Sequence, residues 1–266
     1  MADLGIIGVG ELAEFILLGL RRAGDPRKVF LSPRNAERST RLAQECDAET
    51  SVSNQAVLDS ADLILVAVPP KDAYATIGAL TWQPHHVLIC VAIDVDCAGL
   101  QRRAPAATIV RAMPSSCLAV NRGGTPIFPA EQTATALFET LGDVVILETE
   151  AQFETAAALA SYYLWSFAII DAIAEQAIAQ GLPPGLARSL TASLTAGAAA
   201  VAAAQSDLPA RATLDRYSLP GTMTRQGLEV LEASGAIDPW RKALDIAISR
   251  MRQGRSQSGR SKSGGD

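Results

Sequence analysis

The chain has 266 residues, of which 48% are hydrophobic and 5% aromatic, and a formal net charge of −5. This composition predicts a globular protein with a core of Ala, Leu, Ile and Val, and the length fits two modest domains. The negative charge argues against a nucleic-acid partner. No apolar run approaches the ~18 uninterrupted residues of a membrane span, and no basic leader precedes the first apolar run. We therefore expect a cytoplasmic protein without a membrane partner.

Cysteine and histidine usage gives no sign of a metal site. The four cysteines form no C-x-x-C pair, and the only two histidines are the adjacent His85 and His86. We expect neither a bound metal nor a disulfide framework, and we expect the histidine pair to be solvated. Residues 252–266 are rich in Gly and Ser and lack large apolar side chains, which predicts a disordered tail.

The order of apolar patterns predicts two domains of different class. Up to residue 148, short β-branched runs alternate with amphipathic helical patterns, such as those over residues 11–22 and 35–44. This alternation predicts an α/β domain with a doubly wound parallel sheet of the Rossmann type over residues 1–148. Residues 149–251 carry only helical patterns, broken at 180–185, 206–209 and 218–222, and predict an all-α domain.

The helical pattern over residues 186–205 has Ala and Leu on nearly every face. A helix that is apolar all round must be buried, and a few helices of one chain offer little cover. We therefore expect a homodimer that forms through the helical domain. A compact monomeric bundle is the alternative, because Ala-rich helices can also pack closely within one chain.

The first strand runs directly into the sequence GVGELA. Gly8 and Gly10 have the spacing of a dinucleotide fingerprint, and Ala13 takes its third position. Such a turn brings backbone N–H groups and a helix N-terminus to a pyrophosphate. A glycine-bearing turn with a purely structural role is the alternative. The cofactor-binding residues that we predict here are Gly8, Val9, Gly10, Glu11 and Leu12.

The end of the second strand favours NADPH over NADH. An NAD site usually has a carboxylate there, whereas this chain has Ser32, Pro33, Arg34 and Asn35. A guanidinium with small polar neighbours suits a 2′-phosphate. The alternative is a solvated turn in which Ser32 or Asn35 caps the next helix. A third apolar strand ends at Ala67, Val68 and Pro69, at the sheet edge where ligands of such folds bind.

These motifs together resemble the pyrroline-5-carboxylate reductase family, which reduces a cyclic imine to proline with NAD(P)H. The resemblance rests on GVGELA, SPRN, VAVPP, VRAMPSS and LPGTMTRQGLEVLEASG, in this order along nearly the whole chain. It implies an oxidoreductase of proline biosynthesis with a helical dimerisation domain. It also implies that Asn54 lies near the adenosine side of the cofactor, and that Met113 and Pro114 lie near the nicotinamide.

The resemblance implies a substrate site in the helical domain, at residues 220–224. There the family holds the substrate carboxylate with backbone amides at a helix N-terminus, and Thr224 matches the threonine that contacts the substrate nitrogen. The substrate-binding residues implied in this way are Ser161, Gly221, Thr222, Met223 and Thr224. An N-cap role for Thr222 or Thr224 is the structural alternative.

The sequence departs from the family most in its substrate half. Pro-Gly-Gly-Thr-Thr has become PGTMT, and Gly-Ser-Gly-Pro-Ala-Tyr has become ASYYLW at residues 160–165. Thr222 would be strained if the replaced glycine needed a positive φ, and the loss of Gly-Pro predicts a continuous helix. We expect a divergent member whose imine need not be pyrroline-5-carboxylate.

Two further functions compete with imine reduction. A β-hydroxyacid-type dehydrogenase needs a lysine in its helical domain, but no lysine lies between Lys71 and Lys242. A non-catalytic NADP-binding sensor or assembly protein would keep the cofactor turn and lose the chemistry. Imine reduction needs no strong base, because orientation and a hydrogen bond at the imine nitrogen suffice; Thr224 is the catalytic candidate.

Overall fold

The computed structural model describes residues 2–260. Of these residues, 2–160 and 248–260 form one compact unit, and Ser161–Ala247 form the other. Helical structure takes over at Glu150, close to the predicted change at residue 149. The boundary between the compact units, however, falls at Ser161, within the long helix that begins at Glu150.

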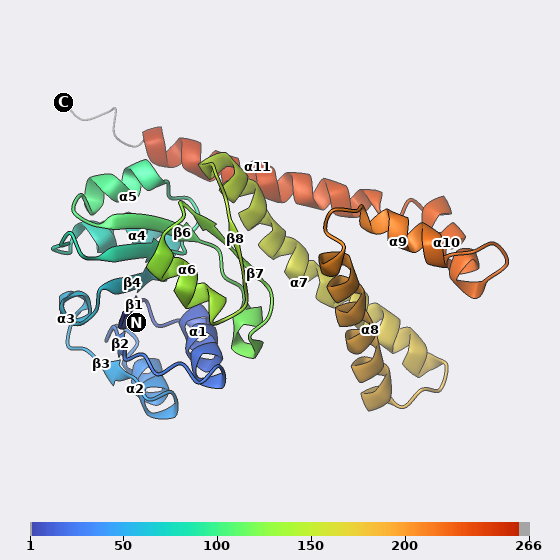
Figure 1. Cartoon of the computed structure of the whole chain (residues 1–266), viewed down its shortest axis with the longest axis horizontal. Helices are drawn as coiled ribbons and strands as arrows, with labels where there is room; N and C mark the ends of the chain where they lie inside the picture. Colours follow the sequence, from blue (N-terminus) through green and yellow to red (C-terminus); the bar gives the residue numbers. More distant parts are fainter. Residues whose placement is uncertain (1, 261–266) are drawn as a thin grey trace. The chain divides into compact units, whose positions relative to one another are not determined.

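The first unit contains an eight-stranded sheet in the order β3-β2-β1-β4-β5-β6-β7-β8 (Figure 1). The strands are β1 (Leu4–Ile7), β2 (Val29–Leu31), β3 (Glu49–Thr50), β4 (Leu63–Val66), β5 (Val87–Cys90), β6 (Thr108–Ala112), β7 (Gly124–Phe128) and β8 (Asp143–Ile146). Neighbours from β3 to β6 pair in parallel, and the strand order reverses between β1 and β4. Ligands of open α/β sheets bind at such a reversal.

The predicted α/β class is confirmed, and two strands of the sheet, β3 and β7, differ from the predicted pattern. The short β3 carries only two exposed residues and therefore has no apolar pattern. Strand β7 contains Pro126, and it pairs antiparallel with β6 and parallel with β8. The sheet is therefore mixed and not wholly parallel.

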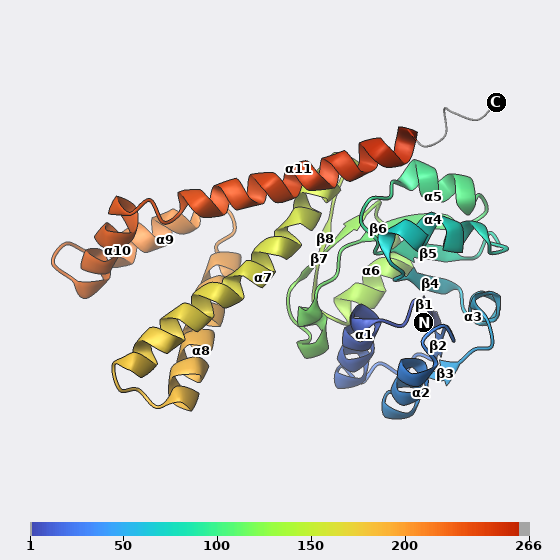
Figure 2. The same cartoon turned by 180° about the vertical axis from the view of Figure 1, so that it is seen from behind.

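Helices cover both faces of this sheet (Figures 1 and 2). They are α1 (Glu11–Arg22), α2 (Ala36–Glu45), α3 (Asn54–Ser60), α4 (Pro70–Gly78), α5 (Cys97–Arg103), the 3-10 helix η1 (Ser116–Val120) and α6 (Gln132–Glu139). One apolar core packs α1, α2 and α6 on the sheet, and a second packs α3, α4 and α5 on the opposite face. Burial on two faces explains why strands such as β1 and β4 are buried at every residue.

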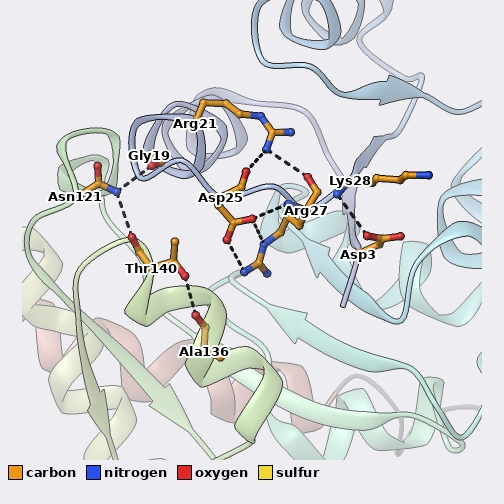
Figure 3. Close-up of polar contacts among 9 residues, drawn as sticks. All are labelled: Asp3, Gly19, Arg21, Asp25, Arg27, Lys28, Asn121, Ala136 and Thr140. Carbon is orange, nitrogen blue, oxygen red and sulfur yellow. Dashed lines mark hydrogen bonds and ion pairs between the residues drawn. The ribbon is translucent and has the colours of Figure 1, made fainter. Parts of the chain in front are cut away.

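A buried polar network fixes the C-terminal end of α1 (Figure 3). Arg27 donates from Nε and Nη2 to the carboxylate of Asp25, both at 2.8 Å, and the two side chains are almost fully buried. Arg21 donates to the backbone carbonyls of both residues. Burial alone would raise the pKa of Asp25, but the hydrogen bonds from Arg27 outweigh it and hold this pKa below its usual value.

The second unit is helical, as expected. Its helices are α7 (Glu150–Ala179), which begins in the first unit, α8 (Pro184–Ala204), α9 (Ala210–Tyr217), α10 (Met223–Ala233) and α11 (Asp238–Arg260), which ends in the first unit. The three breaks from α7 to α10 fall at the predicted interruptions, where Pro, Gly or Ser cluster, whereas the break between α10 and α11 was not predicted. Helix α7 is continuous, in agreement with the loss of the Gly-Pro pair.

Helices α7 and α8 are long and apolar enough to cross a membrane by length and composition alone, although only 11% and 6% of their most apolar windows are buried. Polar residues, such as Asp171 in α7 and Thr195 in α8, interrupt the apolar sequence of both helices. Neither helix therefore contains an uninterrupted apolar run as long as a membrane span. Two such helices are a weak indication of a membrane protein, because helices of water-soluble proteins pass the same test.

The C-terminal helix differs from the expected tail. Disorder was expected from Arg252, but α11 continues to Arg260, and residues 261–266 lie outside the described residues. The reason lies in the preceding sequence, because α11 begins with an amphipathic pattern, and a helix that has formed extends readily through polar residues. Arg250 in this helix forms a bidentate ion pair with Asp94, at 2.9 and 3.0 Å.

Candidate functional site

Three turns at the carboxyl edge of the sheet line one open cavity of about 580 Å³. They follow β1, β2 and β4, the strands on either side of the order reversal. The lining residues are Gly8, Val9, Gly10, Arg34, Asn35, Ala36, Ala67, Val68 and Pro69. Segments that the sequence analysis selected separately therefore meet at one site.

The two glycines of the first turn have different physical roles. Gly8 has φ +99°, and an added Cβ would lie 2.7 Å from the backbone of Ala67. Only glycine fits there without strain. Gly10 is the N-cap of α1 without a side-chain cap, and an added Cβ would meet no atom within 4 Å. The space beside Gly10 and the uncapped helix end could accept an anionic group.

Ser32 supports the glycine turn instead of lining the cavity. Its hydroxyl accepts a hydrogen bond from Gly8 N at 3.0 Å, and its carbonyl accepts one from Ser39 Oγ at 2.8 Å. The side chain is buried and does not line the cavity, and its contact with a 2′-phosphate stays a prediction. Ser32 directly follows β2 with its hydroxyl on the glycine turn, and the sequence alone did not show that orientation.

Arg34 and Asn35 lie at the cavity, on the turn before α2. The Arg34 side chain is largely exposed, and Nη1 lies 3.5 Å from Asp72 Oδ2. Asn35 is the N-cap of α2 and accepts a hydrogen bond from Arg38 N at 3.4 Å. The capping alternative is therefore realised by Asn35 and not by Ser32. Ala36 also lines the cavity; the helix start at Asn35 is the signal that could have revealed it.

The other predicted cofactor residues lie outside the cavity lining. Glu11 is exposed at the start of α1, and Leu12 packs against the apolar core. Asn54 is half-buried at the start of α3, where Ser53 provides the cap. Met113 and Pro114 directly follow β6, and Met113 N donates to Pro126 O at 3.0 Å. The role of these residues toward a cofactor stays a prediction.

Arg111, from the VRAMPSS segment, is a buried structural arginine. Nη1 donates to Glu150 Oε1 at 2.9 Å, and the guanidinium lies 4.5 Å from the centre of the Phe153 ring. The same carboxylate oxygen accepts from Cys97 N at 2.8 Å. Burial and then the charge of Glu150 raise the pKa of Cys97 to about 12, so this thiol stays protonated at neutral pH.

The turn at residues 220–224 has a geometry that removes the expected strain. Gly221 takes the positive φ of +81°, whereas Thr222 has an ordinary φ of −84°. Thr222 Oγ1 accepts from Arg225 N at 3.2 Å and donates to Leu219 O at 2.7 Å, so it is the N-cap of α10. Met223 and Thr224 follow as the first residues of the helix, and both are exposed. Of the two threonines, Thr222 has the capping role.

Aromatic residues near Ser161 pack against Trp240, beside a small apolar cavity in the second unit. Tyr162 and Trp165 both make edge contacts with Trp240, with ring centres 6.2 and 6.5 Å apart. Trp165 and Trp240 also line a cavity of about 290 Å³. Tyr162 and Trp165 therefore lie on a common face of α7, and Ser161 itself is half-buried on the same helix.

The two histidines lie before β5, away from the lining of both cavities. His85 is exposed, as expected, but His86 is buried and its Nδ1 accepts from Gln83 N at 2.9 Å. Burial, followed by the neighbouring His85, lowers the pKa of His86. His86 therefore stabilises the loop in its neutral form, which corrects the expectation of a solvated pair.

The second unit has almost no core of its own. Between Ser161 and Ala247 the buried residues are Ala174, Ala187 and Ser218. Large apolar side chains along α7 and α8 are instead about half exposed, among them Phe167, Ile173, Leu186, Leu190 and Leu194. An exposed apolar surface of this extent marks an interaction surface, and it does not fit a compact monomeric bundle.

Comparison with known proteins supports both halves of this description. The family described as "NADP oxidoreductase coenzyme F420-dependent" matches residues 3–93, and "Pyrroline-5-carboxylate reductase dimerisation" matches residues 150–254. The pyrroline-5-carboxylate reductase of Mycobacterium tuberculosis (strain H37Rv) is 30% identical over 194 residues, 65% of this chain and 65% of its own length. This match thus spans slightly less than two thirds of that relative. The Synechocystis reductase is 26% identical, with 94% and 97% covered.

Solved structures agree with the fold. A pyrroline-5-carboxylate reductase from Coxiella burnetii aligns with a TM-score of 0.80 at 26% identity, covering 95% of this chain and 98% of the other. The Plasmodium falciparum enzyme, solved with NADP bound, aligns with a TM-score of 0.81 at 19% identity, covering 96% and 98%.

The first unit, a Rossmann-type sheet with a cavity at its order reversal, is thus similar to the NADP-dependent oxidoreductases that its family model describes, and a helical unit follows it. Along nearly its whole length, the chain is similar to pyrroline-5-carboxylate reductases.

Proposed function

We propose that this protein is an NADPH-dependent reductase of a cyclic imine, with 1-pyrroline-5-carboxylate or a related imino acid as substrate. The observation that carries the proposal is the cavity at the order reversal, which the glycine turn, the Arg34 turn and the Ala67–Pro69 turn line together. The match of residues 150–254 to the family model for pyrroline-5-carboxylate reductase dimerisation supports the proposal for the helical part of the chain.

The cavity fits a dinucleotide phosphate. Open space beside Gly10 and the uncapped start of α1 suit a pyrophosphate, because backbone N–H groups and the helix dipole favour an anion there. The exposed guanidinium of Arg34, on the next turn, would bind the 2′-phosphate. Val68 and Pro69 would support the nicotinamide side. Bound NADPH would supply the hydride.

The start of α10 would hold the substrate. The first amides of this helix can hold a carboxylate, and Gly221 gives the turn its positive φ. The hydroxyl of Thr222 caps α10, so the hydroxyl of Thr224 would form the hydrogen bond with the imine nitrogen. Water would be the final proton source. Met223 stands where the family has a threonine and gives the turn an apolar, exposed side chain.

The helical domain would form a homodimer. The second unit leaves most of its large apolar side chains exposed and matches a dimerisation domain. A second copy would cover α7 and α8 and provide the core that one chain lacks. The same cover would explain the apolar character of these helices without a membrane, and we place the protein in the cytoplasm.

A panel of imines tests the proposal. NADPH oxidation would be followed with pyrroline-5-carboxylate, piperideine carboxylates and unsubstituted pyrroline. We expect turnover on carboxylated imines and a loss of at least about tenfold in kcat/KM for Thr224→Ala. A preference for uncarboxylated imines would contradict anion capture by the α10 turn. NADPH binding without turnover of any imine would favour a non-catalytic protein.

A further inference from the structure

The Arg34 guanidinium at the cavity faces an acidic residue on a neighbouring helix. Arg34 Nη1 lies 3.5 Å from Asp72 Oδ2. Asp72 occupies the first turn of α4, a helix that begins directly after the cavity residue Pro69. The turns after β2 and β4 thus bring a cation and an anion together beside one ligand cavity.

This ion pair is weak and readily exchanged. The side chain of Arg34 is 74% exposed and that of Asp72 30% exposed, and the contact is long for a charged hydrogen bond. Exposed ion pairs of this kind contribute little free energy. A phosphate monoester with two charges could replace the carboxylate as the partner of Arg34, because it offers stronger, bidentate hydrogen bonds.

We propose that Asp72 is a specificity-determining residue that competes with the 2′-phosphate of NADPH for Arg34 and so limits the preference for NADPH over NADH. This inference rests on the proposed NADPH site. When the phosphate binds, the carboxylate loses its partner and remains close to a group of the same charge. NADH lacks the 2′-phosphate, so Asp72 has no corresponding effect on it.

The position of Asp72 in the first turn of α4 favours an acidic side chain. A negative side chain in the first turn of a helix interacts favourably with the helix dipole. The residue therefore has a structural reason to be acidic that is independent of the cofactor. Substitution by asparagine keeps the shape and the helix position while removing the charge.

The test measures the dissociation constants of NADPH and NADH by fluorescence titration of the full chain. Asp72→Asn is compared with wild type and with Glu139→Gln, an exposed residue of α6 whose substitution changes the net charge equally. We expect Asp72→Asn to bind NADPH about three- to tenfold more tightly at low salt, less so at high salt, and NADH unchanged. Unchanged or weaker NADPH binding, or an equal gain for NADH or in Glu139→Gln, would overturn the proposal.

A double variant separates competition for Arg34 from a general charge effect. In an Arg34→Gln background, the gain from Asp72→Asn should fall below about twofold, because the contested cation is absent. An undiminished gain would overturn competition as the cause. If wild type binds neither NADPH nor NADH, the proposed cofactor site itself fails, an outcome distinct from NADPH binding that does not respond to Asp72→Asn.

Discussion

The backbone N–H of Gly8 donates a hydrogen bond to the hydroxyl of Ser32, 3.0 Å away and 24 residues later in the chain. This bond joins the turn after β1 to the end of β2 and sets the position of the glycine turn relative to Arg34. Ser32→Ala should leave the Gly8 N–H without this partner and lower the free energy of unfolding by about 1–3 kcal/mol. Urea denaturation measures the change. The matched variant Ser60→Ala removes an exposed hydroxyl from the end of α3 and should stay within about 0.5 kcal/mol of wild type.

The two glycines of the turn should respond differently to alanine. Gly8→Ala forces a Cβ against the Ala67 backbone at a positive φ, and should cost at least about 2 kcal/mol of stability. Gly10→Ala meets open space in the protein and should fold with nearly normal stability. It should still weaken NADPH binding by about tenfold or more, because the methyl group enters the space for the pyrophosphate. Full NADPH affinity in a folded Gly10→Ala protein would place the pyrophosphate elsewhere.

The buried pair of Asp25 and Arg27 predicts a specific acid sensitivity. The pKa of Asp25 is lowered in the folded protein, so its stabilising contribution is present above the pKa of the unfolded chain and is lost as the pH falls through the folded value. The stability difference between wild type and Asp25→Asn should therefore shrink as the pH falls from 7 toward 3. Denaturation at a series of pH values checks this, and a difference independent of pH would contradict it.

Removal of the arginine is the more damaging change in that pair. Arg27→Met leaves a buried carboxylate without its two hydrogen bonds from the guanidinium and without its ion pair, and should cost about 3–5 kcal/mol at pH 7. The double variant Asp25→Asn with Arg27→Met should recover part of this loss, because no unpaired charge remains. Thermal or urea unfolding of the three variants measures the coupling.

The exposed apolar face of α8 predicts a dimer that charge can disrupt. Leu194→Glu puts a carboxylate among side chains that a second copy would cover. Light scattering should give the mass of two chains for wild type and a shift toward one chain for the variant. Ala75→Glu adds the same charge on the exposed side of α4 and should remain dimeric. A monomeric wild type would contradict the proposed assembly.

The sequence was sufficient to predict the elements whose pattern is local. Helix α1 has the predicted ends, and the breaks between α7 and α10 fall where Gly and Pro interrupt the pattern. The cavity was predictable for the same reason, because parallel strands place their following turns at one edge. Strand β3 was missed because its pairing with β2 is set by neighbours and not by its two exposed residues.

The orientation of individual side chains could not be predicted from the sequence. A serine at the end of a strand can bind a phosphate, cap a helix or form buried hydrogen bonds that hold two segments together. The structure shows that Ser32 forms such buried hydrogen bonds, with Gly8 and with Ser39. The sequence also did not show that His86 is buried. Nor did it show that Gly221, and not Thr222, takes the positive φ of the turn, which leaves Thr222 unstrained.

Deuterium transfer tests the central claim most directly. NADPH that carries deuterium at both positions of the nicotinamide C4 would be incubated with the protein and the imine panel, and the products analysed by mass spectrometry. Hydride transfer to a C=N bond predicts a cyclic amine with one deuterium on the former imine carbon. Binding of the labelled NADPH without any labelled amine would contradict imine reduction.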